Sequence, residues 1–209
     1  MGLSVEIPGL STILPEVPDG KVAIVEGGAD GAKAFFARTL ARTALQNGRR
    51  VTYLTSRDGP EVMAEIDRGR TPGGDRHGLL RVEELDALTD ASAADAIDGL
   101  LAIDSFSFLT LDFSPSALAN LLRSLRVRCA RNGLCVVLAT DRGMFDLRSE
   151  AITVHLSDGL IQFQSKEGPE GIVRYLRIPK WPTGTLTDRN IYYEFDGHRL
   201  AIDLRRRVL

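Results

Sequence analysis

The sequence predicts an α/β fold with a mostly parallel central sheet, helices on both of its faces and antiparallel hairpins at the C-terminal edge. Short apolar segments alternate with helical segments through the first two-thirds of the 209 residues, as they do around a parallel sheet. Residues 99–104 form a near-continuous apolar run, which is typical of a strand covered on both faces. Beyond about residue 150 the pattern changes to strands and turns, which favours hairpins at one edge.

The first two predicted strands are each followed by a helix. Residues 21–26 are a short apolar run that suits a buried strand, and a Gly-rich turn leads from them into a helix expected over residues 34–46. The Asn-Gly pair that follows ends this helix. Residues 51–55 are rich in β-branched side chains and predict the second strand, and Pro60 opens the next helix.

The middle of the chain continues the alternation. Gly and Pro cluster in residues 70–78, which makes them the strongest loop signal, and residues 79–82 suit another strand. A helix with a leucine-rich face starts at Pro115, capped by the serine before it, and ends at the Asn-Gly pair 132–133. Residues 134–140 are the next buried strand.

The last part of the chain predicts two strand pairs. Residues 160–164 and 171–178 flank a Gly/Pro turn. Residues 191–195 and 198–203 form a hairpin around an Asp-Gly turn, which two-residue hairpin loops favour.

Composition indicates one globular domain. With 44% hydrophobic residues, a chain of this length can bury a sizeable core. No internal repeat, low-complexity segment or linker divides it, so we expect a single domain over residues 1–209. The core is expected over about residues 18–150 and the hairpin region over about residues 151–209.

Charge and apolar content exclude several classes of function. The net charge of −2 gives no overall basic field for nucleic acid or an anionic membrane. No apolar run approaches the roughly 18 residues of a membrane span, and residues 1–10 do not resemble a signal peptide. We therefore expect a soluble, cytoplasmic protein. Cys129 and Cys135 are expected as buried free thiols, and the three histidines lack metal-ligand spacing.

The Gly-rich turn after the first strand matches the outline of a phosphate-binding loop. The pattern G-x-x-x-x-G-K-[ST] needs a strand before it and a helix after it, and both are predicted. Gly27 and Lys33 fit, but Ala32 replaces the second glycine and Ala34 replaces the hydroxyl residue that reaches magnesium. The alternative is an ordinary tight turn with a solvated lysine. The predicted nucleotide-binding residues are Gly27, Gly28, Ala29, Asp30, Gly31, Ala32, Lys33 and Ala34.

Asp104 supplies a second signal of the same kind. It ends an apolar strand, as does the Walker B aspartate that holds magnesium through water. Alone, an aspartate that caps a loop or a helix is the commoner interpretation. In the right order on suitable strands, the loop and Asp104 together favour a P-loop fold. Asp104 is the predicted indirect Mg²⁺ ligand, and the predicted cofactor is ATP or ADP with Mg²⁺, bound weakly or not at all.

Several segments, spread over nearly the whole chain, carry a family resemblance in their order and spacing. They are residues 7–10, 17–28, 51–55, 60–63, 103–109, 156–163 and 174–180. Taken together they resemble the KaiC-like branch of the RecA superfamily of P-loop ATPases. The resemblance implies a RecA-like P-loop core that closes with C-terminal hairpins.

The resemblance also implies where this chain departs from active ATPases. In the family a pair of glutamates activates the attacking water, and Arg57 and Asp58 are at the matching positions. Arginine cannot accept a proton, and aspartate reaches less far than glutamate. After Lys180 the family continues toward an arginine that senses a neighbour's nucleotide, whereas this chain has Trp181-Pro182.

These departures predict relaxed or abandoned hydrolysis. A degenerate member is expected to act in regulation or signal transduction, through a protein partner or paralogous ATPase or as a homo-oligomer. One alternative is an active ATPase with Asp58 as the catalytic base and Asp104 for Mg²⁺. Another is a recombinase-like module for single-stranded DNA, against which the slightly acidic composition argues.

Overall fold

A computed structural model describes residues 2–14, 16–68, 78–89, 98–168, 171–184 and 187–203. Within these residues, one sheet of nine strands organises the chain. Its parallel strands are β3 (Val22–Gly27), β4 (Val51–Thr55), β5 (Leu80–Glu84), β6 (Leu100–Ile103), β7 (Cys135–Asp141) and β8 (Gly159–Gly168). Antiparallel strands β9 (Gly171–Lys180), β10 (Thr187–Phe195) and β11 (Leu200–Ile202) extend one edge. The strand order is β11-β10-β9-β8-β3-β7-β6-β4-β5.

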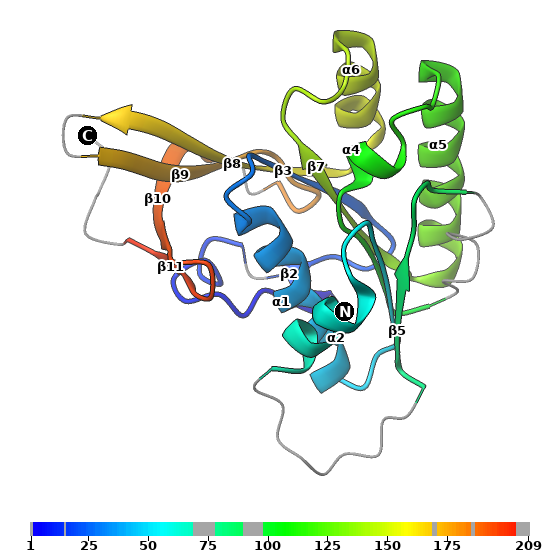
Figure 1. Ribbon diagram of the computed structural model, residues 1–209, viewed down its shortest axis with the longest axis horizontal. Helices are drawn as coiled ribbons and strands as arrows, with labels where there is room; N and C mark the ends of the chain where they lie inside the picture. The colour runs from blue at the N-terminus through cyan, green and yellow to red at the C-terminus, as the bar shows by residue number, and fades with distance from the viewer. Residues whose placement is uncertain are drawn as a thin grey trace.

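Helices cover both faces of the parallel part. They are α1 (Ala32–Gln46), α2 (Gly59–Asp67), α4 (Phe106–Leu109), α5 (Pro115–Asn132) and α6 (Leu147–Leu156). Figure 1 shows α1 and α2 on one face and α5 and α6 side by side on the other, with β9 to β11 beyond β8 at one edge of the sheet. A small sheet of β1 (Leu3–Ser4) and β2 (Glu16–Val17) lies at the α1 face.

Strand β3 is buried on both faces, which explains why its residues are continuously apolar rather than alternately apolar and polar. Ala23 and Val25 pack into the core beneath α1, while Val22 and Ile24 pack into the second core beneath α5. Both sides of the strand are therefore buried, as the continuous apolar run predicts.

The observed boundaries agree closely with most of the predicted elements. Strand β4 has the predicted limits, and α1 begins two residues earlier than expected. Helix α5 begins and ends as predicted: Ser114 accepts a hydrogen bond from the N–H of Ala117, and Gly133 takes the left-handed backbone at its end. Cys129 and Cys135 are buried free thiols, and burial raises the pKa of Cys129 to about 12.

Two expectations for the C-terminal part need correction. The boundary near residue 150 falls inside α6, which the sequence pattern did not predict, and β8 still pairs in parallel with β3. Helix α6 is inconspicuous because Ile152, Thr153 and Val154 are β-branched and favour strands. The final hairpin is present, but its loop has four residues, 196–199, since Phe195 pairs directly with Leu200.

The predicted loop at residues 70–78 lies outside the described residues, except for Gly78, and so does the turn between β8 and β9. In the described segments, no helix combines the length and apolar character that crossing a membrane requires.

Candidate functional site

The carboxyl ends of the parallel strands gather the candidate functional residues at one edge of the sheet. The Gly-rich loop 27–34 follows β3, residues 57–58 follow β4, and Asp104 follows β6. Strand β7 lies between β3 and β6, and its last residue, Asp141, pairs in register with Gly27. Ligands of open α/β sheets bind at this edge, so the topology places the predicted residues where a ligand is expected.

The backbone of the loop tolerates the altered motif. At Gly27 a Cβ would approach the Cβ of Phe163 to 3.3 Å, so this glycine allows close packing. Gly31 adopts the left-handed conformation before α1, with φ of 82°. Among the described non-glycine residues only Ser105 has a positive φ, so Ala32 takes an ordinary helical backbone. The alanine in place of the second glycine therefore causes no backbone strain.

Lys33 already has an anionic partner within the chain. Its Nζ donates to Oδ1 of Asp141 at 2.7 Å and to the carbonyl oxygen of Gly28 at 2.8 Å. The lysine side chain is only 8% exposed. Ser107 on α4 donates to Oδ2 of Asp141 and accepts from its backbone N–H. The positive charge that a phosphate would need is thus neutralised by Asp141, at the end of the neighbouring strand β7.

A second carboxylate lies inside the loop itself. Asp30 Oδ1 accepts from the backbone N–H of Ala32 at the start of α1, where an anion is favoured. Its Oδ2 accepts from the hydroxyl of Tyr193 at 3.3 Å and lies 3.7 Å from Nε of Arg174. Burial and the charge of Asp30 raise the pKa of Tyr193, so this hydroxyl stays protonated as a donor. The C-terminal strands therefore hold the loop.

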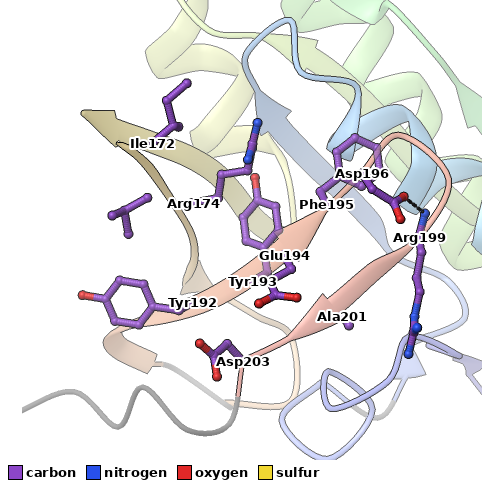
Figure 2. A pocket seen from close by; sticks show the side chains of 11 residues that line it. Ile172, Arg174, Tyr192, Tyr193, Glu194, Phe195, Asp196, Arg199, Ala201 and Asp203 are labelled. Atoms are coloured by element: carbon purple, nitrogen blue, oxygen red, sulfur yellow. Dashed lines mark hydrogen bonds between the residues drawn. The ribbon is translucent and has the colours of Figure 1, made fainter. Parts of the chain in front are cut away.

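A pocket of about 460 Å³ lies among the C-terminal strands, and two of its lining residues, Arg174 and Tyr193, also contact Asp30 of the loop. Figure 2 shows Arg174 and Phe195 directed toward the segment after β3, from the neighbouring strands β9 and β10. The ring of Phe195 packs edge-on against Phe35 of α1, with centroids 5.6 Å apart. The lining residues are Ile172, Val173, Arg174, Tyr192, Tyr193, Glu194, Phe195, Asp196, Arg199, Ala201 and Asp203.

Asp104 is buried and surrounded by cations. It is 2% exposed, and its Oδ2 accepts from the hydroxyl of Tyr53 at 3.3 Å. Burial raises its pKa above the ordinary value of 3.8, and the nearby charges of Arg38, Arg57 and Lys33 oppose that rise. Asp104 follows β6 and the loop with Lys33 follows β3, on strands separated only by β7, so the topology places both at the same edge of the sheet.

The two arginines belong to an ion network across α1 and α2. Nε of Arg38 lies 3.0 Å from Glu65, and Arg57 reaches both Glu65 and Glu61 at 3.3 Å. Arg38 is buried, and its Nη1 has no hydrogen-bond partner. Sequence reasoning missed Arg38 because an arginine within a helix gives no signal that it points into a site.

Asp58 has a structural role in this arrangement. It is the N-cap of α2, and its Oδ1 accepts from the backbone N–H of Glu61 at 2.8 Å. Its neighbour Arg57 forms ion pairs with Glu61 and Glu65. Capping accounts for an aspartate at position 58, and its use as a catalytic base stays a prediction.

The residues around Lys33 do not suit magnesium. Position 34 lacks the hydroxyl ligand, the Asp104 carboxylate is bonded to Tyr53, and the Asp141 carboxylate is bonded to Lys33 and Ser107. Nearby guanidinium groups add positive charge where a dication would have to bind. Within the described ranges, no three or more His, Cys, Asp or Glu side chains are grouped to hold a metal.

Lys180 and Trp181 are both engaged inside the molecule. Nζ of Lys180 donates to the carbonyl oxygens of Val154, His155 and Ser157 at the end of α6. Trp181 is 5% exposed and packs over Gly159, where a Cβ would lie 2.8 Å from the indole ring. Lys180, the last residue of β9, therefore holds the end of α6, and Trp181 covers the start of β8.

No family model and no curated protein sequence matches this chain. Two solved structures resemble it over nearly their full length. One is the flagellar accessory protein FlaH from Methanocaldococcus jannaschii, with 15% identity, a TM-score of 0.75, and coverage of 97% of this chain and 98% of that one. The other is a KaiC-like protein from Pyrococcus horikoshii OT3, with 16% identity, a TM-score of 0.73, and coverage of 97% and 99%. At this identity the likeness shows the fold, and the predicted RecA-like α/β class is confirmed.

Proposed function

We propose that this chain is a regulatory RecA-fold protein that binds nucleotide phosphates weakly and hydrolyses ATP little or not at all. The observation that carries the proposal is the pairing of Lys33 with Asp141 at 2.7 Å. A phosphate must displace this charge-assisted bond before it can use the lysine, and it meets the repulsion of the aspartate. Both effects lower the affinity without removing the loop.

Three further features argue against hydrolysis. Ala34 has no oxygen for magnesium, Arg57 cannot act as a base, and Asp58 is committed to the cap of α2. A general base must lie within hydrogen-bond reach of the water that it activates. A single loss can be compensated, but the three together leave no complete set of catalytic groups.

Other features support residual binding. The backbone of residues 28–30 is exposed beside the N-terminus of α1, where N–H groups favour anions. A pocket of about 460 Å³ among β9 to β11 falls within the range of small-molecule sites, and its lining residues Arg174 and Tyr193 also contact Asp30 of the loop. The exposed backbone of the loop is the feature that supports residual phosphate binding.

The regulatory part of the proposal rests on fold analogy. One structural neighbour is described as a flagellar accessory protein, and another as KaiC-like. We assign this chain a comparable accessory role, exerted through contacts with a protein partner, with a paralogous ATPase or between copies of itself.

Calorimetry and turnover assays test the nucleotide part. We expect ATP and ADP to bind the purified chain with a dissociation constant nearer about 1 mM than about 1 µM. Lys33→Ala should abolish binding, while Lys166→Ala, which removes an exposed lysine of β8, should bind like wild type. ATP turnover at about 1 s⁻¹ or faster that disappears in Lys33→Ala would contradict the proposal.

A further inference from the structure

A groove of about 670 Å³ lies between α5 and α6, on the face of the sheet opposite α1. Both helices connect parallel strands, so they run in the same direction, and Figure 1 shows them side by side. Each helix contributes one stripe of residues at helical spacing, from Pro115 to Arg123 on α5 and from Arg148 to Leu156 on α6. The two stripes enclose the groove over slightly more than two turns, or about 12 Å.

Small and apolar side chains line much of the groove. The side chains of Ala119 and Ala151 are short, which leaves the space between the two helices open. Ile152 and Leu156 are half-buried and pack against the core beneath α5, so they form an apolar floor. Covering such a floor with another apolar surface is favourable, because it removes apolar area from water.

Exposed apolar residues extend both stripes. Leu147 precedes Ala151 by one turn of α6 and is 86% exposed, and Val127 follows Arg123 by one turn of α5 and is 49% exposed. Since the helices run in the same direction, these two side chains lie toward opposite ends of the groove. The apolar surface is therefore longer than the groove itself, as a docked helix of several turns requires.

The charged side chains that line the groove are all positive. They are Arg123 and Arg148, and the described lining residues include no Asp or Glu. The one acidic side chain of the two helices, Glu150, lines a different pocket. Arg123 donates to the neutral amide of Asn120 at 3.4 Å, and in the described part of the chain neither groove arginine forms a salt bridge. The groove thus complements an acidic partner, although the chain as a whole carries a net charge of −2.

We propose that the groove between α5 and α6 binds an acidic amphipathic helix of a protein partner. Apolar side chains of that helix cover the floor, and its Asp or Glu side chains pair with Arg123 and Arg148. Nucleic acid suits the groove less well, because the described lining residues include no Phe, Tyr or Trp on which a base could stack. The inference rests on the regulatory part of the proposed function, since it names the surface and the partner chemistry of that role.

Fluorescence anisotropy with three synthetic helical peptides tests the partner chemistry. The first peptide carries leucines at i, i+3, i+4 and i+7, flanked by glutamates. The second has glutamines in place of the glutamates, and the third has serines in place of the leucines. The first should bind the purified chain with a dissociation constant of about 10–100 µM, and the other two at least about tenfold more weakly.

Variants of the chain locate the binding surface. Arg123→Glu and Arg148→Glu should each weaken binding of the first peptide about tenfold, because attraction becomes repulsion. Ala151→Trp should weaken it by a similar factor, because the larger side chain fills the groove from an exposed position. Arg131→Glu makes the same charge change at an exposed residue of α5 outside the groove and should bind like wild type. Thermal melts confirm that each variant is folded.

Outcomes separate the inference from the proposed function. Affinity that is unchanged in both arginine variants, or no binding of the first peptide at about 1 mM, overturns the inference. Tighter binding of a single-stranded oligonucleotide than of the peptide overturns it in favour of nucleic acid. Self-association that Arg123→Glu abolishes overturns it in favour of a second copy of the chain. Nucleotide binding is measured through Lys33 on the opposite face of the sheet, so each of these results leaves the nucleotide part of the function standing.

Discussion

Under the proposed function, Asp141 competes with a phosphate for the lysine of the Gly-rich loop. Its carboxylate accepts a hydrogen bond from Lys33, although the two residues are 108 positions apart in the sequence. Lys33 and Asp104 were predictable because each stands at a recognisable place in a motif. Asp141 was not, because only the pairing of β7 with β3 brings it to the loop.

Asp141→Asn should raise nucleotide affinity and lower stability. Removing the negative charge ends its competition with phosphate, and we expect about tenfold tighter ATP binding, or about 1.4 kcal/mol. The free energy of unfolding without ligand should fall by about 1–2 kcal/mol, since buried Lys33 loses its ionic partner. Calorimetry and denaturant titration measure the two effects. Asp98→Asn, at an exposed site, is the charge-matched control, and unchanged affinity in Asp141→Asn would refute the competition.

Asp104 should make the protein less stable as the pH rises. Burial raises its pKa in the folded state above the ordinary 3.8, so the folded chain binds this proton more tightly than the unfolded chain does. The contribution is fully favourable below pH 3.8 and is lost as the pH increases through the higher folded pKa. Asp104→Asn removes it, so the stability difference between variant and wild type should shift in favour of the variant across that window. Parallel stability curves for the two proteins from pH 3.8 upward would rule this out.

At the scale of elements, the C-terminal strands hold the Gly-rich loop. Tyr193 and Arg174 contact Asp30, and Phe195 packs on α1. Tyr193 and Asp30 are 163 residues apart in the sequence. The strands themselves were predictable from their alternation and turns. Their position over the loop was not, because it depends on the order in which β8 to β10 join the sheet.

Helix α6 is an element that its local sequence does not predict. Local sequence favours strands there, and burial of only Ser149 and Thr153 leaves a faint apolar pattern. What holds this helix in the structure is tertiary: Lys180 caps its last carbonyl groups. Burial lowers the pKa of Lys180, whose amine donates to these carbonyl groups at the helix C-terminus.

Lys180→Ala should therefore destabilise the isolated chain. Loss of the contacts to the end of α6 is expected to lower the free energy of unfolding by about 1–2 kcal/mol. Denaturant titration at low protein concentration measures this without any partner subunit. Lys166→Ala provides the comparison, since that lysine is exposed on β8. A lysine that served only a neighbouring subunit would leave the stability of the single chain unchanged when replaced.

At the scale of the whole molecule, two buried cores form the RecA-like architecture, and positions 34 and 57 of the candidate site lie outside them. The cores use the two faces of the same sheet, and neither includes Ala34 or Arg57. The side chains at these two positions can therefore vary with little effect on the cores. Fold class could be predicted because it depends on many apolar positions, whereas function depends on a few side chains whose partners are set by topology.

Ligand binding at the loop should stabilise the entire chain. At a nucleotide concentration about ten times the dissociation constant, linkage gives about 1.4 kcal/mol of stabilisation. For a domain of this size that corresponds to a rise in Tm of about 3–6 °C. Differential scanning calorimetry with ATP in EDTA should show this rise for wild type and for Lys166→Ala, and none for Lys33→Ala. An equal rise in Lys33→Ala would mean that the nucleotide binds away from the loop, since that variant lacks the only lysine that the Gly-rich segment contributes.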